Sequence, residues 1–251
     1  MLTALIILSL LANAAAVTLF LCKKAKPAWI AFSVAWVLGI ATFVTNWLSC
    51  GHAPFANMFH VLAFLPLALL PTLVFFSFTE RELSWMNAAF PALACVAGIG
   101  TLFMDRTADW SLNPALKSPF FVPHVMSYCF SYALCGVAFL MGIAFFVKKE
   151  NRDRCLSASH ALIRLAVPFM TLGLCLGAIW AEQAWGIYWS WDAKETFSLV
   201  TWLTYLGFLH LLKTKHHKTV ANVVQMIGFV MLLGTFFGVN LLTSVHAYAL
   251  S

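Results

Sequence analysis

Eight long apolar runs dominate this chain and restrict it to a membrane-embedded fold. They cover residues 1–22, 27–48, 57–79, 85–104, 124–147, 160–181, 196–213 and 219–243, and polar or charged residues separate each run from the next. A helix needs about 20 mostly apolar residues to cross a bilayer. Because the runs are too long for strands, the sequence predicts an all-α, polytopic membrane helix bundle with about eight transmembrane helices.

The composition excludes several other classes of protein. Only 10% of the 251 residues are charged and 62% are hydrophobic, whereas about a quarter of a soluble domain is charged. The net charge of +6 arises from short basic clusters between the apolar runs, which indicates membrane topology rather than nucleic-acid binding. The seven cysteines form no CxxC pair, so a zinc ribbon, a thioredoxin site and a CxxCH haem-attachment site are excluded. We expect a single integral membrane domain over residues 1–251 in a lipid bilayer, with no nucleic-acid partner.

The Lys and Arg residues predict the orientation in the membrane. If the helices alternate in direction, three basic residues lie on one side, namely Arg106, Lys117 and Lys194, and the other 12 of the 15 lie on the opposite side. Cytoplasmic loops are the ones enriched in Lys and Arg. We therefore expect the rich side to be cytoplasmic and both termini to be non-cytoplasmic.

A tryptophan-rich segment joins the sixth and seventh runs on the predicted external side. It reads WGIYWSWDAKET over residues 185–196, and its four aromatic rings, Trp185, Tyr188, Trp189 and Trp191, fall within seven residues. Membrane interfaces are ordinarily aromatic, but not at this density with glycine and aspartate between the rings. Such a cluster suits a flat, π-rich ligand with a charged rim, and porphyrin fits that description best. We expect residues 182–197 to form an external loop that packs on the edge of the macrocycle.

The charged residues of this segment have different predicted roles. Lys194 or Arg106 is expected to pair with a haem propionate, as charge-assisted contacts do. Asp192 and Glu195 cannot favour a propionate directly. They are expected to orient the loop, pair with Lys194, or cap the following helix at its N-terminus, where negative charge is favoured.

Two histidines are predicted to lie on the same external side. His124 begins the fifth run within PHVMSY, and His246 follows the eighth run within SVHAY. Taken alone, either is best interpreted as an interfacial histidine bonded to a carbonyl. Haem iron takes two axial ligands, and neutral imidazole is a common one. Their joint placement with the aromatic loop therefore predicts that His124 and His246 bind iron from opposite faces.

The chain resembles the CcsA (ResC) type of cytochrome c biogenesis protein over most of its length. The matching segments are PFANMF at 54–59, PHVMSY at 123–128, the "WWD" segment at 185–202, YLGFLH at 205–210 and GVNLLTSVHAY at 238–248. The resemblance assigns haem binding to His124 and His246 together with the WWD segment. Ala193 and Phe197 stand where the family usually has Pro and Trp, which bears on the fine shape of the loop.

The resemblance also implies a second haem position, within the membrane. It makes His210 one of a pair of haem ligands whose other histidine belongs to a ResB/CcsB-type membrane partner. From the residues alone, His210 is either a functional intramembrane group or a histidine at the cytoplasmic interface. His60 stands where the family carries Glu. It is either an extra haem contact or a polar residue satisfied in the bundle, and we favour the second.

The predicted function is that of a haem-handling subunit of a cytochrome c synthase of the System II type. The resemblance implies that haem b moves to the external site and is presented for thioether attachment to the CxxCH of apocytochrome c. It implies a ResB/CcsB-type partner and possible thiol-reducing proteins, and no residue is assigned as acid or base. The expected location is the bacterial inner membrane or its thylakoid equivalent, with the haem site on the periplasmic face. Two alternatives stay open: a CcmC-type protein that delivers haem without covalent attachment, and a non-haem transporter or assembly subunit.

Overall fold

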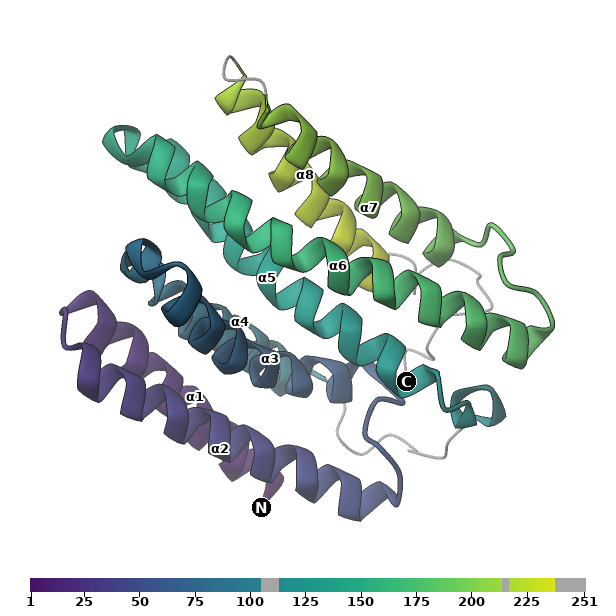
Figure 1. The fold of residues 1–251 in the computed structure, drawn as a ribbon. Helices are drawn as coiled ribbons and strands as arrows, with labels where there is room; N and C mark the ends of the chain where they lie inside the picture. Colours follow the sequence, from purple (N-terminus) through teal and green to yellow (C-terminus); the bar gives the residue numbers. More distant parts are fainter. Residues whose placement is uncertain (105–112, 214–216, 238–251) are drawn as a thin grey trace. The chain divides into compact units, whose positions relative to one another are not determined.

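The computed structural model describes residues 1–104, 113–213 and 217–237, and its regular structure is entirely helical (Figure 1). No strand occurs within these ranges, so the prediction of an all-α fold is confirmed. The α-helices are α1 (Leu2–Leu21), α2 (Ala25–Cys50), α3 (Met58–Thr79), α4 (Ala89–Leu102), α5 (Phe121–Val147), α6 (Arg152–Trp185), α7 (Ala193–Leu211) and α8 (Lys218–Phe236). The short 3₁₀ turns are η1 (Arg81–Met86), η2 (Pro114–Lys117) and η3 (Lys149–Asn151).

Each α-helix overlaps one of the predicted apolar runs, and six of those described are long and apolar enough to cross a membrane: α1, α2, α3, α5, α6 and α8. Helix α4 is shorter, with 14 residues, because the chain first forms η1. Helix α7 carries Lys194 and Glu195 in its first turn, which shortens its apolar stretch. The prediction of about eight crossings with both termini outside stays a prediction.

The helices form two compact units, one within residues 1–113 and one that begins at Pro114. In the first unit, α1 packs against α2 and α4, and α3 packs against the same two helices. In the second, α5 packs against α6 and α8, and α7 packs against the same two helices. The prediction of one integral domain over the whole chain stays a prediction.

A tryptophan in the first unit compensates for a proline inside a helix. Pro71 lies within α3 and has no N–H, so the carbonyl of Leu67, four residues earlier, loses its helical donor. The indole Nε1 of Trp36 on α2 donates to that carbonyl over 2.9 Å. A freed carbonyl in a membrane helix must find such a partner. This contact therefore lets α3 keep its proline.

Polar side chains join α8 to α5 in the second unit. The side-chain amide of Asn222 donates to the carbonyl of Gly142 over 3.1 Å, and that of Gln225 donates to the carbonyl of Ala138 over 3.3 Å. Both side chains are fully buried. Hydrogen bonds between helices hold membrane bundles together where the hydrophobic effect cannot. They help to fix the bundle that carries the predicted site.

The Trp36–Leu67 contact can be tested with a double-mutant cycle. The Trp36→Phe variant keeps the ring but leaves the Leu67 carbonyl without a donor, so we expect the free energy of unfolding to fall by about 1–3 kcal/mol. The Pro71→Ala variant restores the backbone N–H that serves this carbonyl, and should recover most of that loss in the Trp36→Phe background. Unfolding in detergent micelles measures both effects. Equal effects of Pro71→Ala in the two backgrounds would contradict the assignment.

Candidate functional site

His124 lies in the first turns of α5, with its ring against α6. Its Nδ1 is 2.8 Å from the carbonyl oxygen of Gly173. A carbonyl can only accept, so Nδ1 carries the proton, and in the neutral form of the ring the lone pair is on Nε2. Such a bond is expected of a structural interfacial histidine, and it is also the usual outer contact of a metal-binding histidine. The tautomer therefore suits iron coordination through Nε2.

The ring of His124 fits against α6 because two glycines face α5. A Cβ added at Gly177 would lie 2.7 Å from both Cε1 and Nδ1 of His124. A Cβ added at Gly173 would lie 2.9 Å from the ring of Tyr128, one turn further along α5. The sequence motif Gly173-xxx-Gly177 predicts only close helix packing in general. In the structure it accommodates two particular rings, one of which is the predicted ligand.

Trp180 connects His124 to the tryptophan-rich segment, and the sequence analysis missed it. Its ring centroid lies 5.5 Å from that of His124 and 5.0 Å from that of Trp185. Its indole nitrogen donates to the carbonyl of Ala115 over 2.7 Å, which fixes the ring. One signal was available: residues 173, 177 and 180 share a helix face at the spacing i, i+4, i+7.

The tryptophan-rich segment is a short connection between two helices. Helix α6 remains helical to Trp185 and ends at Gly186, whose φ of 75° is a left-handed conformation that suits glycine. The non-helical connection is therefore residues 186–192, and the predicted loop at 182–197 includes both helix ends. Tyr188 and Trp191 are 60% and 69% exposed. These rings form an open aromatic surface.

Asp192 and Glu195 cap the N-terminus of α7 at the end of the segment, which is one of the roles expected of them. Asp192 is the N-cap of α7: its carboxylate accepts the backbone N–H of Glu195 over 2.9 Å, and Glu195 accepts that of Asp192 over 3.3 Å. The Glu195 carboxylate also accepts the N–H of Ser190 over 2.7 Å. This capping box fixes the backbone beside Trp191, whose positive φ of 60° is unusual for a bulky residue. Asp192 thus caps α7, one of the roles expected of it, and its contact with haem as part of the WWD segment stays a prediction.

The remaining polar groups of the segment are suited to an anion. Lys194 lies in the first turn of α7, and burial lowers its pKa to about 8, while the neighbouring Asp192 acts in the opposite direction. The indole Nε1 of Trp189 is buried and has no acceptor among the described residues. The ring of Trp189 stands edge-on to that of Trp191, with centroids 5.8 Å apart. A lysine and an indole N–H are both hydrogen-bond donors for a carboxylate.

His210 and His60 lie on other helices than His124. His210 is exposed in the last turn of α7. Lys194 lies in the first turn, so the two residues are about 24 Å apart along the helix axis. His60 is 1% exposed in the first unit, and its backbone N–H donates to the N-cap side chain of Asn57 over 2.9 Å. Its imidazole is therefore buried within the first unit, and its role as a polar residue satisfied in the bundle stays a prediction. His246 and Arg106 lie outside the described residues.

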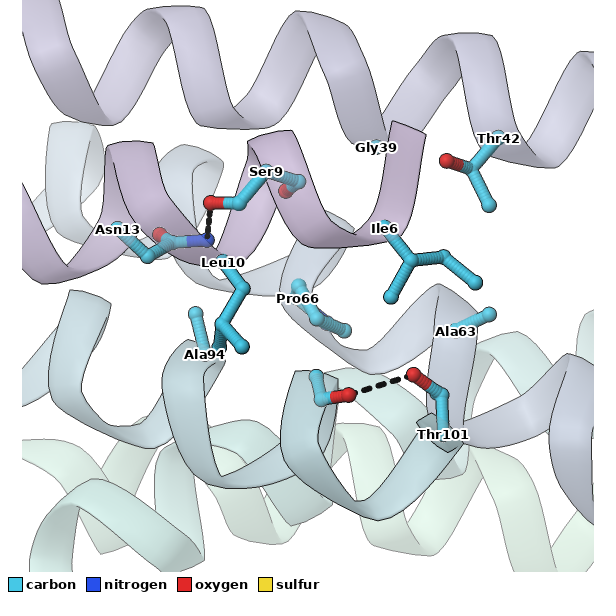
Figure 2. Close-up of a pocket in the computed structure, with 11 residues that line it drawn as sticks. Ile6, Ser9, Leu10, Asn13, Gly39, Thr42, Ala63, Pro66, Ala94 and Thr101 are labelled. Atoms are coloured by element: carbon cyan, nitrogen blue, oxygen red, sulfur yellow. Dashed lines mark hydrogen bonds between the residues drawn. The ribbon is translucent and has the colours of Figure 1, made fainter. Parts of the chain in front are cut away.

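A small cavity lies within the first unit. Its volume is about 30 Å³, and Figure 2 shows Ser9, Asn13 and Thr101 among the side chains that line it. Ser9 and Thr101 donate their hydroxyl protons to backbone carbonyls. A space of this size admits one water molecule and is far too small for a tetrapyrrole. Within the described ranges, moreover, no group of three or more His, Cys, Asp or Glu side chains converges on a metal position.

The capping box generates the first prediction about this site. Replacement of Asp192 by Ala removes the acceptor for the N–H of Glu195 and should cost about 1 kcal/mol of stability. It should also increase proteolytic cleavage between residues 186 and 192. Asp192→Asn is the matched control, because asparagine caps helices as well as aspartate does. Cleavage and unfolding of the two variants, measured in detergent, test the capping role, and equal losses in both would contradict it.

Known proteins resemble this chain in sequence and in fold. The family described as "Cytochrome C assembly protein" matches residues 53–246, a range that contains every predicted site residue. The cytochrome c biogenesis protein CcsA of Chlamydomonas reinhardtii is 32% identical over 237 residues, which cover 87% of this chain and 67% of the relative. CcsA of Zea mays is 30% identical over 270 residues, which cover 83% and 84%.

The fold is also found in a solved structure. The cytochrome c haem lyase CcmF superposes with a TM-score of 0.72 at 18% sequence identity. The superposition covers 92% of this chain but only 45% of CcmF, so the chain spans less than half the length of that protein.

Proposed function

Because this chain belongs to the cytochrome c assembly protein family and is a cytochrome c biogenesis protein of the CcsA type, we propose that it is the haem-handling subunit of a cytochrome c synthase. In this role it holds haem b at an external site and presents it to the CxxCH of apocytochrome c. A ResB/CcsB-type membrane subunit is the proposed partner, and thiol-reducing proteins would keep the substrate cysteines reduced. The proposed location is the bacterial inner membrane or the thylakoid.

The contact between His124 and Gly173 is the observation that carries this proposal. The bond from Nδ1 to the carbonyl of Gly173 leaves the lone pair on Nε2, the atom that an iron ligand needs. The same ring lies one aromatic contact, through Trp180, from the tryptophan-rich segment. The imidazole is thus linked by ring contacts to Trp185, the first ring of the tryptophan-rich segment.

The residues of the segment have separate proposed roles around a porphyrin. Tyr188 and Trp191 are exposed and supply flat apolar contact area, and Trp185 contacts Trp180. Lys194 and the indole N–H of Trp189 supply donors for the propionates. His246 would be the second residue to hold the iron, on the basis of the sequence. Haem supplies the vinyl groups that react with the cysteine thiols, and the protein supplies position and orientation.

His210 is proposed to act at an earlier stage. It lies at the other end of α7 from the tryptophan-rich segment, and its side chain is exposed on that helix. An exposed histidine in the last turn is able to meet a histidine of another membrane subunit. We therefore assign it to a haem position shared with the ResB/CcsB-type partner, from which haem passes outward to His124.

Spectra of the full-length protein test the axial ligands. The wild-type chain, loaded with ferric haem and then reduced, should show the Soret and α bands of low-spin bis-histidine haem. His124→Ala and His246→Ala should each lose these features, and added imidazole should restore them. His217→Ala, which alters an exposed histidine at the start of α8, is the control and should match the wild type.

Two results of this experiment contradict particular parts of the proposal. The absence of haem absorbance in the wild type favours a non-haem transporter or assembly subunit. Unchanged spectra in both alanine variants remove His124 and His246 as ligands. Thioether formation on an apocytochrome c, in cells that express the chain with its partner, separates a synthase subunit from a CcmC-type delivery protein.

The role of Lys194 predicts a pH dependence. Pairing with a propionate favours the charged ammonium, so the pKa of Lys194 should rise above about 8 when haem binds. The contribution of Lys194 to haem affinity should then be constant below about pH 8 and fall as the pH rises above it, because the free protein must take up a proton to bind. Titrations with haem at several pH values measure this slope.

Two variants serve as controls for the lysine. Lys194→Arg stays charged throughout this pH range and should bind haem without the fall. Lys194→Met should bind more weakly at neutral pH and also lose the slope. An unchanged slope in Lys194→Met would exclude Lys194 as a propionate partner.

A further inference from the structure

We propose that Gly177 is a positioning residue for the haem ligand. Because Gly177 has no side chain, the His124 imidazole can lie against α6 and donate to the carbonyl of Gly173. This bond in turn sets the electron donation of Nε2 to iron. This inference rests on the proposed function, in which His124 binds haem. It adds to that function a site on α6 that controls the orientation and the basicity of the ligand.

The geometry of α6 explains why residue 177 must be glycine. An α-helical carbonyl accepts the N–H of the residue four positions later, so the carbonyl of Gly173 points along the helix toward residue 177. His124 Nδ1 uses the second lone pair of that carbonyl, 2.8 Å away. The imidazole is thereby brought directly over Cα of Gly177. The three heavy atoms nearest to an added Cβ all belong to His124, at 2.7, 2.7 and 3.7 Å.

The other sides of the imidazole are also occupied by fixed groups. Tyr128 stands edge-on to His124, with centroids 5.1 Å apart, and its own ring is packed against Gly173. Trp180 lies on another side and is held by its bond to the Ala115 carbonyl. The ring therefore has little room to move away from an added methyl group without breaking the bond to Gly173.

The bond from Nδ1 affects the iron as well as the orientation of the ring. Donation of the Nδ1 proton to a carbonyl makes the imidazole a more basic ligand through Nε2. A more basic ligand stabilises ferric iron more than ferrous iron and so lowers the reduction potential of the haem. If the bond is broken, the potential should rise and the axial bond should weaken.

Helix α6 also connects this position to the tryptophan-rich segment. Trp185 follows Gly177 by eight residues on the same unbroken helix, a rise of about 12 Å. The carbonyl that orients His124 and the first ring of the segment therefore belong to one rigid element. If His124 shifts relative to α6, the distance from His124 to the proposed porphyrin changes, while the tryptophan-rich segment keeps its position.

The experiment compares Gly177→Ala with a matched glycine variant. Gly207→Ala is the control, because a Cβ at Gly207 on α7 meets nothing within 4 Å. In the full-length protein loaded with ferric haem, Gly177→Ala should bind haem about 10- to 100-fold more weakly. It should show high-spin features that imidazole reverses, and a raised reduction potential. Gly207→Ala should match the wild type. A Gly177→Ala protein with the spectrum and potential of Gly207→Ala would overturn the proposal.

A second measurement keeps the inference testable apart from haem. In protein without haem, Gly177→Ala should destabilise the fold in the wild-type background but not in the His124→Ala background, where the ring that it meets is absent. If the Gly177→Ala protein does not accumulate, accumulation of the double variant with His124→Ala supports a clash between residue 177 and the His124 ring. If the double variant also fails to accumulate, the clash is contradicted. Equal destabilisation in the two backgrounds also contradicts it. A wild-type protein that binds no haem overturns the proposed function, whereas this cycle still decides whether Gly177 positions His124.

Discussion

The structure depends on the requirement that backbone polar groups in a bilayer find partners within the protein. This requirement restricts the apolar runs to helices and makes each interruption of a helix costly. Pro71 is such an interruption, and the indole of Trp36 supplies the donor that the Leu67 carbonyl lacks. At His124 the group that needs a partner is the imidazole N–H, and the second lone pair of the Gly173 carbonyl accepts it.

Close approach between helices converts these backbone groups into contacts with side chains. Leu67 packs on Gly39 beside the Trp36 bond, and His124 packs on Gly177 beside the Gly173 bond. In both cases a glycine brings a neighbouring helix near enough for a ring nitrogen to reach a carbonyl. Small residues at membrane helix interfaces are usually explained by van der Waals packing alone. Here they also give access to the backbone as a hydrogen-bond acceptor.

The site shows which inferences a linear pattern supports. The aromatic density of residues 185–191 and the capping role of Asp192 and Glu195 follow from local spacing, because a capping box joins residues three apart. Trp180 was overlooked because its partners, Ala115 and His124, are 65 and 56 positions away in the chain. The predicted loop begins earlier than the connection because the sixth apolar run ends at residue 181, whereas α6 continues to Trp185.

The sequence by itself determined the all-α class, the positions of the helices, and the family through its tryptophan-rich and histidine-bearing segments, since these depend on composition and local spacing. Only the tertiary structure decided that His124 donates to the Gly173 carbonyl, that Gly177 is the residue beneath its ring, and that Trp180 joins it to Trp185. The physical reason is that these contacts depend on the rotation and axial offset of α5 against α6. Helix periodicity predicts which face of a helix is buried. Which residues of two facing helices come into contact depends on how the rings fit into the gaps left by glycines.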